Sequence, residues 1–102
     1  MQVRVVEQAR RDVRAALLWW KTNRPAAPGG LEIELSTALS QIKNQPRSGP
    51  ETRYPGAKGK GFRRMALNGA RYFVYYRVDE AKQEVVVLRL WHMSRRHRPK
   101  LP

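Results

Sequence analysis

The spacing of apolar side chains divides the first half of the chain into distinct predicted elements. A short run of β-favouring side chains at residues 2–7 predicts a strand. From Ala9 to Trp20 the apolar side chains recur every three or four positions with charged residues between them, which predicts an amphipathic helix over about 9–24. The helix should end before Pro25, because a proline disfavours helical backbone in the preceding residue.

The same helical spacing returns from Leu31 to Ile42 and predicts a second helix over about 29–44. The connector between the two helices is short, which favours an antiparallel helical hairpin. Residues 46–61 then show neither helical nor strand periodicity, and they are rich in Pro, Gly, Arg and Lys. We expect a long basic loop there, and loops of this length in compact domains are often functional.

Three strands are predicted in the remainder of the chain, over about 62–67, 71–78 and 84–92, where β-branched and aromatic residues dominate. Asn68-Gly69 between the first two strands is a strong hairpin signal. Simple alternation along the last strand divides it into one face with Val86, Leu88 and Leu90 and another with Val85, Val87, Arg89 and Trp91. The chain ends in a basic tail, residues 94–102.

Together these elements predict an α+β fold with the order β-α-α-β-β-β. The N-terminal helical hairpin should pack on one face of a small, chiefly antiparallel sheet. The length of 102 residues suits a single domain over 1–102. No apolar run is long enough to span a bilayer, and Met1 to Glu7 lack the features of a signal peptide, so we expect a cytoplasmic protein that does not contact membranes.

The strongest compositional signal is charge. Lys and Arg number 21 against 8 Asp and Glu, for a formal charge of +13, and residues 51–102 hold 13 of the basic side chains and 4 of the acidic ones. Such an excess indicates a polyanionic partner, and an acidic protein would satisfy the electrostatics as well as a nucleic acid would. The partner surface should therefore lie in the C-terminal half.

Few side chains in this sequence point to catalysis. Cysteine is absent, which excludes disulfides, thiolate metal sites and a Cys nucleophile. The sequence contains no dinucleotide or phosphate-binding glycine motif, and His92 and His97 match no metal-binding spacing, so we expect neither a metal nor a cofactor. Arg, Lys, Tyr and His remain, and these can supply the acid, the base and the positive charge of a metal-independent ribonuclease.

Several short motifs keep a characteristic order along the chain. In the second half an Arg-containing strand precedes an aromatic strand and a valine-rich strand; the residues concerned are Arg63 or Arg64, Tyr72 to Val78, Val85 to Leu90, and then His92, Arg95, Arg96 and Pro99. The first half adds Ala9 and Asp12, Trp19-Trp20, and Pro46 with Gly49. In this arrangement the chain resembles the RelE/ParE superfamily of bacterial type II toxin–antitoxin systems, in particular its ParE-like plasmid-stabilisation branch.

The resemblance implies a toxin that a cognate antitoxin neutralises by wrapping an acidic segment around the hairpin and sheet, in a toxin–antitoxin hetero-oligomer. RelE-like members cleave mRNA on the ribosome, whereas ParE-like members poison DNA gyrase without a known catalytic centre. Ala66 and Phe73 stand where the RelE-like pattern has basic side chains, and the tail lacks a Tyr. We therefore favour a ParE-like gyrase inhibitor that is not an enzyme. The alternatives are a RelE-like endoribonuclease and a small basic nucleic-acid-binding protein.

Two sets of residues follow from these readings. A ribonuclease would use Arg64, Tyr76, His92, Arg95 and Arg96. Antitoxin or target binding would use Trp19, Trp20, Arg63, Arg64, Arg89, Trp91, Arg95, Arg96 and Arg98. Trp19 and Trp20 cannot both face the core of one helix, so we expect one to be structural. The basic tail is either a solvated run of charge or a docking site for an acidic chain or for phosphates.

Overall fold

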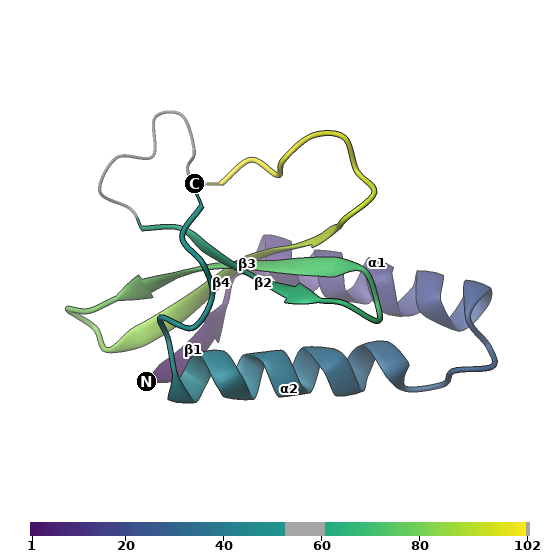
Figure 1. Cartoon of the computed structure of the whole chain (residues 1–102), viewed down its shortest axis with the longest axis horizontal. Coiled ribbons are helices and arrows are strands. Elements are labelled where there is room, and N and C mark those ends of the chain that lie inside the picture. Colours follow the sequence, from purple (N-terminus) through teal and green to yellow (C-terminus); the bar gives the residue numbers. More distant parts are fainter. Residues whose placement is uncertain (53–60, 102) are drawn as a thin grey trace.

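The computed structural model describes residues 1–52 and 61–101. Along the chain it contains β1 (Gln2–Val5), α1 (Glu7–Asn23), α2 (Gly30–Asn44), β2 (Arg63–Leu67), β3 (Tyr72–Asp79) and β4 (Glu84–His92). This order confirms the predicted α+β fold class. The helices lie on one side of the sheet and the C-terminal tail on the other (Figure 1). We call the face toward the helices the inner face and the opposite one the outer face.

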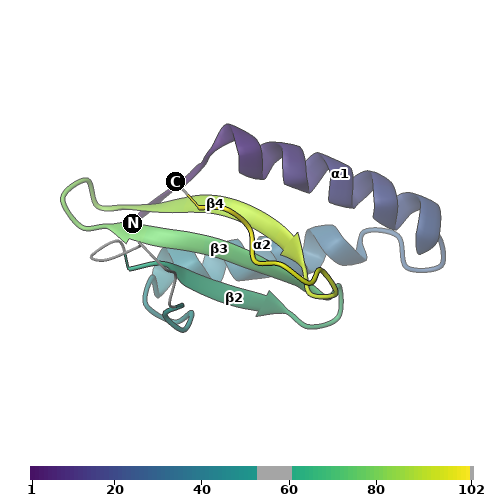
Figure 2. The same ribbon diagram turned by 90° about the horizontal axis from the view of Figure 1, so that it is seen from above.

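The four strands form one sheet in the order β1-β4-β3-β2. β1 runs parallel to β4, while β3 is antiparallel to both β4 and β2, so the sheet is chiefly antiparallel as predicted. β1 pairs with β4 over Glu84 to Val87. Past that point, α1 runs alongside the second half of β4 (Figure 2). This change of neighbour, from strand to helix, determines how the end of β4 is held.

A β-bulge in β4 corrects the predicted alternation. Tyr75 lies opposite Arg89 and Tyr76 opposite Val87, so Leu88 is an extra residue in the ladder. One extra residue reverses the side-chain parity beyond it. Leu90 therefore packs in the inner core with Val85 and Val87, and the prediction that grouped it with Val86 and Leu88 is wrong.

The main core lies between the helices and the inner face. Helix residues Ala9, Ala16, Trp20, Leu31, Ala38 and Ile42 pack there against Met65, Leu67, Val74, Tyr76, Val85, Val87 and Leu90 from the strands. A smaller cluster on the outer face contains Phe62, Val86 and Leu88, with the partly buried Leu101 packed against it. The tail thus returns across the outer face, and Pro99 is fully buried. The tail backbone is therefore held against the sheet, while the side chains of Arg95, Arg96, Arg98 and Lys100 are exposed.

The β2–β3 hairpin forms where Asn68-Gly69 predicted it, but its turn runs over four residues, 68–71. The positive φ of 67° falls on Arg71, and the Arg71 N–H donates to the Leu67 carbonyl at 2.7 Å. The Gly69 N–H donates to the Glu34 carboxylate of α2 at 2.9 Å, and a Cβ on Gly69 would lie 2.9 Å from the second carboxylate oxygen. The absence of a side chain at Gly69 therefore allows the Glu34 carboxylate of α2 to approach the backbone this closely.

Pro50 and Glu51 pair with the start of β2. Of the predicted basic loop 46–61, residues 53–60 lie outside the described residues. Glu51 forms an isolated antiparallel bridge with Arg63, and the Arg64 N–H donates to the Pro50 carbonyl at 3.1 Å. Among the helices of the described residues, none is long and apolar enough to cross a membrane.

Candidate functional surface on the outer face

Arginine and aromatic side chains alternate across the outer face. The strand register aligns Arg64, Tyr75 and Arg89 in one row, and Ala66, Phe73 and Trp91 in the next. The Arg64 guanidinium carbon lies 4.1 Å from the centre of the Phe73 ring, and that of Arg89 lies 4.9 Å from the Trp91 ring. Each ring therefore carries a stacked cation, an arrangement that restrains the arginine side chains and leaves them weakly hydrated.

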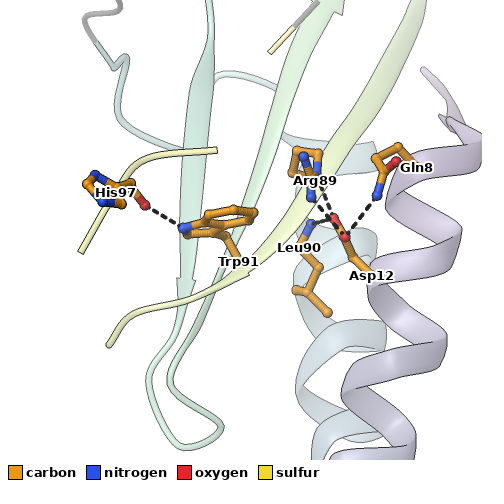
Figure 3. Close-up of polar contacts among 6 residues, drawn as sticks. All are labelled: Gln8, Asp12, Arg89, Leu90, Trp91 and His97. Atoms are coloured by element: carbon orange, nitrogen blue, oxygen red, sulfur yellow. Dashed lines mark hydrogen bonds and ion pairs between the residues drawn. The ribbon is translucent and has the colours of Figure 1, made fainter. Parts of the chain in front are cut away.

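Trp91 fastens the basic tail to this face. Its indole Nε1 donates to the His97 carbonyl at 2.7 Å, on the side of the sheet away from α1 (Figure 3). The Arg95 guanidinium carbon sits 4.0 Å from the centre of the Trp91 ring. With Pro99 buried farther along, the tail backbone is held at several points while its cationic side chains extend outward.

The tail and β4 enclose a groove of about 720 Å³, here called the tail groove, which is lined by Arg89, Trp91, Arg95, Arg96, His97, Arg98 and Lys100. Its lining, among the described residues, includes no carboxylate. Five of the seven side chains are permanent cations, and Asp12 compensates the charge of Arg89 alone. Five of the 13 basic side chains of the C-terminal half thus line one groove.

Asp12 closes the edge of β4 that β1 does not reach. The Leu90 N–H donates to the Asp12 carboxylate at 3.0 Å, and Arg89 donates to both carboxylate oxygens, at 2.7 and 3.1 Å (Figure 3). Gln8 adds a longer contact at 3.4 Å. Both partners of the Asp12–Arg89 ion pair are largely buried. Arg89, which we expected to contact a partner, therefore first links α1 to the sheet.

A second hollow, of about 360 Å³, lies between α1 and the end of β4. Trp19, Tyr72 and His92 line it; Trp19 is 46% exposed, and the His92 ring packs edge-on against Tyr72 with 4.9 Å between centroids. The Ser94 N–H donates to His92 Nδ1 at 3.1 Å, so that nitrogen carries no proton. Burial, together with the nearby Arg71 and Arg95 cations, lowers the pKa of His92. Both effects favour the neutral imidazole.

Tyr76 has a structural position on the inner face. It is fully buried, its hydroxyl donates to the Pro46 carbonyl at 2.9 Å and it accepts the Gly49 N–H at 2.8 Å. Burial raises the pKa of Tyr76. A Cβ at Gly49 would come within 2.9 Å of the Tyr76 ring, so glycine is needed there. A hydroxyl buried and bonded in this way cannot reach a substrate, and we withdraw Tyr76 as a ribonuclease residue.

The structure does not bring the five ribonuclease candidates together. Arg64 and Arg96 belong to the outer face and the tail, and Tyr76 lies in the inner core, whereas His92 lies in the hollow beside α1, which Arg95 of the tail also lines. Six of the nine binding candidates do share the outer face and its tail: Arg64, Arg89, Trp91, Arg95, Arg96 and Arg98.

The other three binding candidates lie elsewhere. Trp19 lines the hollow beside α1, and Arg63 donates to the Gly49 carbonyl at 2.8 Å. Trp20 is 5% exposed and donates to the Ala27 carbonyl at 2.8 Å, so it is the structural member of the pair and is not available to a partner.

Sequence reasoning missed the role of Asp12. A signal was present, because Asp12 shares a helix face with Ala9 and Ala16, three and four residues away, and a carboxylate on an apolar stripe needs a buried partner. The stacking of Arg64 on Phe73 was also missed. Among the described residues, no three His, Cys, Asp or Glu side chains gather as a metal site would require.

Comparison with known proteins places these features in context. Residues 3–97 match the family model described as the ParE toxin of the type II toxin–antitoxin system parDE. The toxin–antitoxin complex RelBE2 from Mycobacterium tuberculosis is similar in structure, with a TM-score of 0.58 and 26% identity over 89% of this chain and 95% of that one. A metal-bound toxin from Helicobacter pylori shares the fold, with a TM-score of 0.62 and 12% identity over 92% and 96% of the two chains. No curated protein matches this chain.

Proposed function

Because this chain belongs to the ParE toxin family of type II toxin–antitoxin systems, we propose that it is the toxin of such a system and that it inhibits growth by poisoning DNA gyrase. The observation that carries the choice of target is the separation of the ribonuclease candidates. Acid, base and charge stabilisation must converge on one phosphate for RNA cleavage. Here Tyr76 is enclosed in the inner core and Arg64 lies on the outer face, so neither belongs to the hollow that His92 and Arg95 share.

The outer face itself supports the same choice. Ala66 and Phe73, which stand where the ribonuclease pattern has basic side chains, are neighbours in one row of the outer face. Phe73 is stacked under Arg64, so this row offers aromatic and small side chains in place of proton donors. A surface of this composition suits recognition of a macromolecule more than proton transfer.

A cognate antitoxin is the second part of the proposal. The RelBE2 relative is a toxin–antitoxin complex, and a charge of +13 favours an antitoxin segment that is acidic. The helices offer apolar contacts for it, since Leu18 of α1 and Ile33 of α2 are 68% and 67% exposed and Trp19 is 46% exposed. We place this one-domain toxin in the cytoplasm, where its target and its antitoxin would both be found.

The test measures two activities of the purified chain in parallel. One assay follows supercoiling of a plasmid by gyrase, and the other follows cleavage of mRNA on translating ribosomes. We expect inhibition of gyrase and intact mRNA. Ribosome-dependent cuts with unaffected gyrase would establish the endoribonuclease alternative and refute the gyrase proposal.

A variant of the tail tests the surface in cells. We expect Arg95→Ala combined with Arg96→Ala to require about tenfold more toxin for the same growth arrest, which corresponds to about 1.4 kcal/mol of lost binding. The matched control removes two exposed cations elsewhere, Lys43→Ala with Lys82→Ala, and should keep full toxicity. Full toxicity of the tail variant would remove these arginines from the target-binding surface.

A further inference from the structure

We propose that the tail groove binds the phosphate backbone of duplex DNA, so that the chain contacts DNA directly as well as its protein partners. Nothing in the gyrase proposal requires this contact. The tail cations Arg95, Arg96, Arg98 and Lys100 line one side of the groove and extend from a backbone that Trp91 and the buried Pro99 hold in place. Because this backbone is already held, phosphate binding would have to order only the cationic side chains.

The composition of the groove favours a nucleic acid over an acidic protein. A protein partner buries apolar side chains between its polar contacts. The large exposed apolar side chains of the described residues are Leu18, Trp19 and Ile33, and all three lie on the helices. The side chains that line the tail groove are five cations, one indole and the His97 imidazole, and the cations suit the closely spaced charges of a phosphate backbone.

The covered aromatic rings favour duplex over single-stranded nucleic acid. Proteins that bind single strands stack the bases on open aromatic rings. Arg95 covers Trp91 at 4.0 Å and Arg64 covers Phe73 at 4.1 Å, while Arg89 also stacks against Trp91. With arginines already on these rings, base stacking would have to displace them, whereas phosphate contacts use the guanidinium groups as they stand.

The experiment measures binding of the purified chain to fluorescent 20-base-pair duplex DNA by anisotropy, without gyrase. Four phosphates neutralised by the tail cations predict a slope of log affinity against log salt of about −3.6, which is about a 150-fold loss of affinity between 50 and 200 mM salt. We expect Arg96→Gln, Arg98→Gln and Lys100→Gln together to weaken binding at least tenfold at about 100 mM salt and to flatten the slope to about −0.9. Arg95 is left in place because it packs on Trp91.

A matched variant separates the groove from net charge. The control variant removes three exposed cations outside the groove through Lys21→Gln, Lys43→Gln and Lys82→Gln. Its affinity for the duplex should change by less than about threefold. Arg96→Lys with Arg98→Lys keeps the charge of the groove and should keep binding. Equal losses in the two Gln variants would overturn the proposal, as would an absence of binding at 50 mM salt.

Three competing ligands identify the occupant. Single-stranded DNA of the same sequence, duplex RNA and poly-glutamate of equal charge should each bind more weakly than duplex DNA. Tighter binding of poly-glutamate would make the groove a protein-docking surface, and tighter binding of either alternative nucleic acid would refute duplex DNA. A chain that poisons gyrase but fails to bind DNA disproves only this inference, and one that binds DNA but leaves gyrase active disproves only the proposed function.

Discussion

The inner and outer faces of this sheet use the same residue types for different purposes. In the core on the inner face, Trp20 of α1 and Tyr76 of β3 are buried and their polar atoms are hydrogen-bonded to backbone groups. On the outer face, Trp91 and Phe73 are partly exposed and carry stacked arginines. Residue type alone therefore does not identify a functional side chain here. Burial and the saturation of hydrogen bonds distinguish a structural residue from one that can meet a partner.

The bulge at Leu88 determines which residues of β4 reach which face. Without the extra residue, alternation would have turned Leu90 outward and Arg89 and Trp91 toward the core. With it, Leu90 packs inward and Trp91 becomes the anchor of the tail. The boundary between the two faces is held by Asp12, which binds both Arg89 and the backbone of Leu90.

The largest expected effect is that of replacing the core residue Trp20 with alanine, compared with the same replacement of Trp91 on the outer face. Trp20→Ala should lower the free energy of unfolding by about 3–5 kcal/mol, because it opens a cavity in the core. Trp91→Ala should cost about 1 kcal/mol, for lost cation–π contacts and one hydrogen bond, while weakening attachment of the tail. Urea unfolding of both variants measures the difference. Equal losses of unfolding free energy in the two variants would show that Trp91 stabilises the fold as much as a core tryptophan does.

An intermediate effect is expected at the boundary between the faces. Asp12→Ala should lower the free energy of unfolding by about 2–4 kcal/mol, because it leaves Arg89 without its counter-charge and the Leu90 N–H without its acceptor. Glu7→Ala is the matched control on the same helix, since Glu7 pairs with Arg11 and Arg14 through exposed side chains. Its effect should be much smaller. If both variants unfold at the same urea concentration, Asp12 contributes no more than a surface ion pair.

The order of elements was predictable because each depends on local spacing. Helical periodicity predicted both helices, and Asn68-Gly69 predicted the hairpin, since these signals lie within a few residues of the structure they encode. Helical spacing also predicted that only one of Trp19 and Trp20 faces the core, although it did not say which. The family resemblance added the expectation that this order belongs to a toxin, and the match over residues 3–97 agrees with it.

The missed features depend on residues that are distant in the sequence. The bulge arises from the pairing of β4 with β3, and the role of Asp12 depends on β1 ending at Val5, more than 80 residues before Leu90. Tyr76 was taken as a ribonuclease candidate because a tyrosine hydroxyl can serve in acid–base chemistry, and its hydrogen bonds were not foreseen because their partners, Pro46 and Gly49, come from a segment without periodicity. Tertiary contacts of this kind leave little trace in local patterns.

The smallest expected effect concerns His92, which lies where α1 meets the end of β4. Because burial and the Arg71 and Arg95 cations lower its pKa, the unfolded chain binds a proton more readily than the folded one. Stability from this group is complete above about pH 6.5, the ordinary histidine pKa, and is lost as the pH falls toward the lower folded value. His92→Asn offers Ser94 an uncharged acceptor and should flatten the fall in unfolding free energy between pH 7 and pH 5. His97→Asn, which changes an exposed ring in the tail, should keep the wild-type slope. A steep fall in the unfolding free energy of the His92→Asn variant would assign the pH dependence to another titratable group. It would also show that burial of the His92 imidazole contributes no more to this dependence than the exposed His97 does.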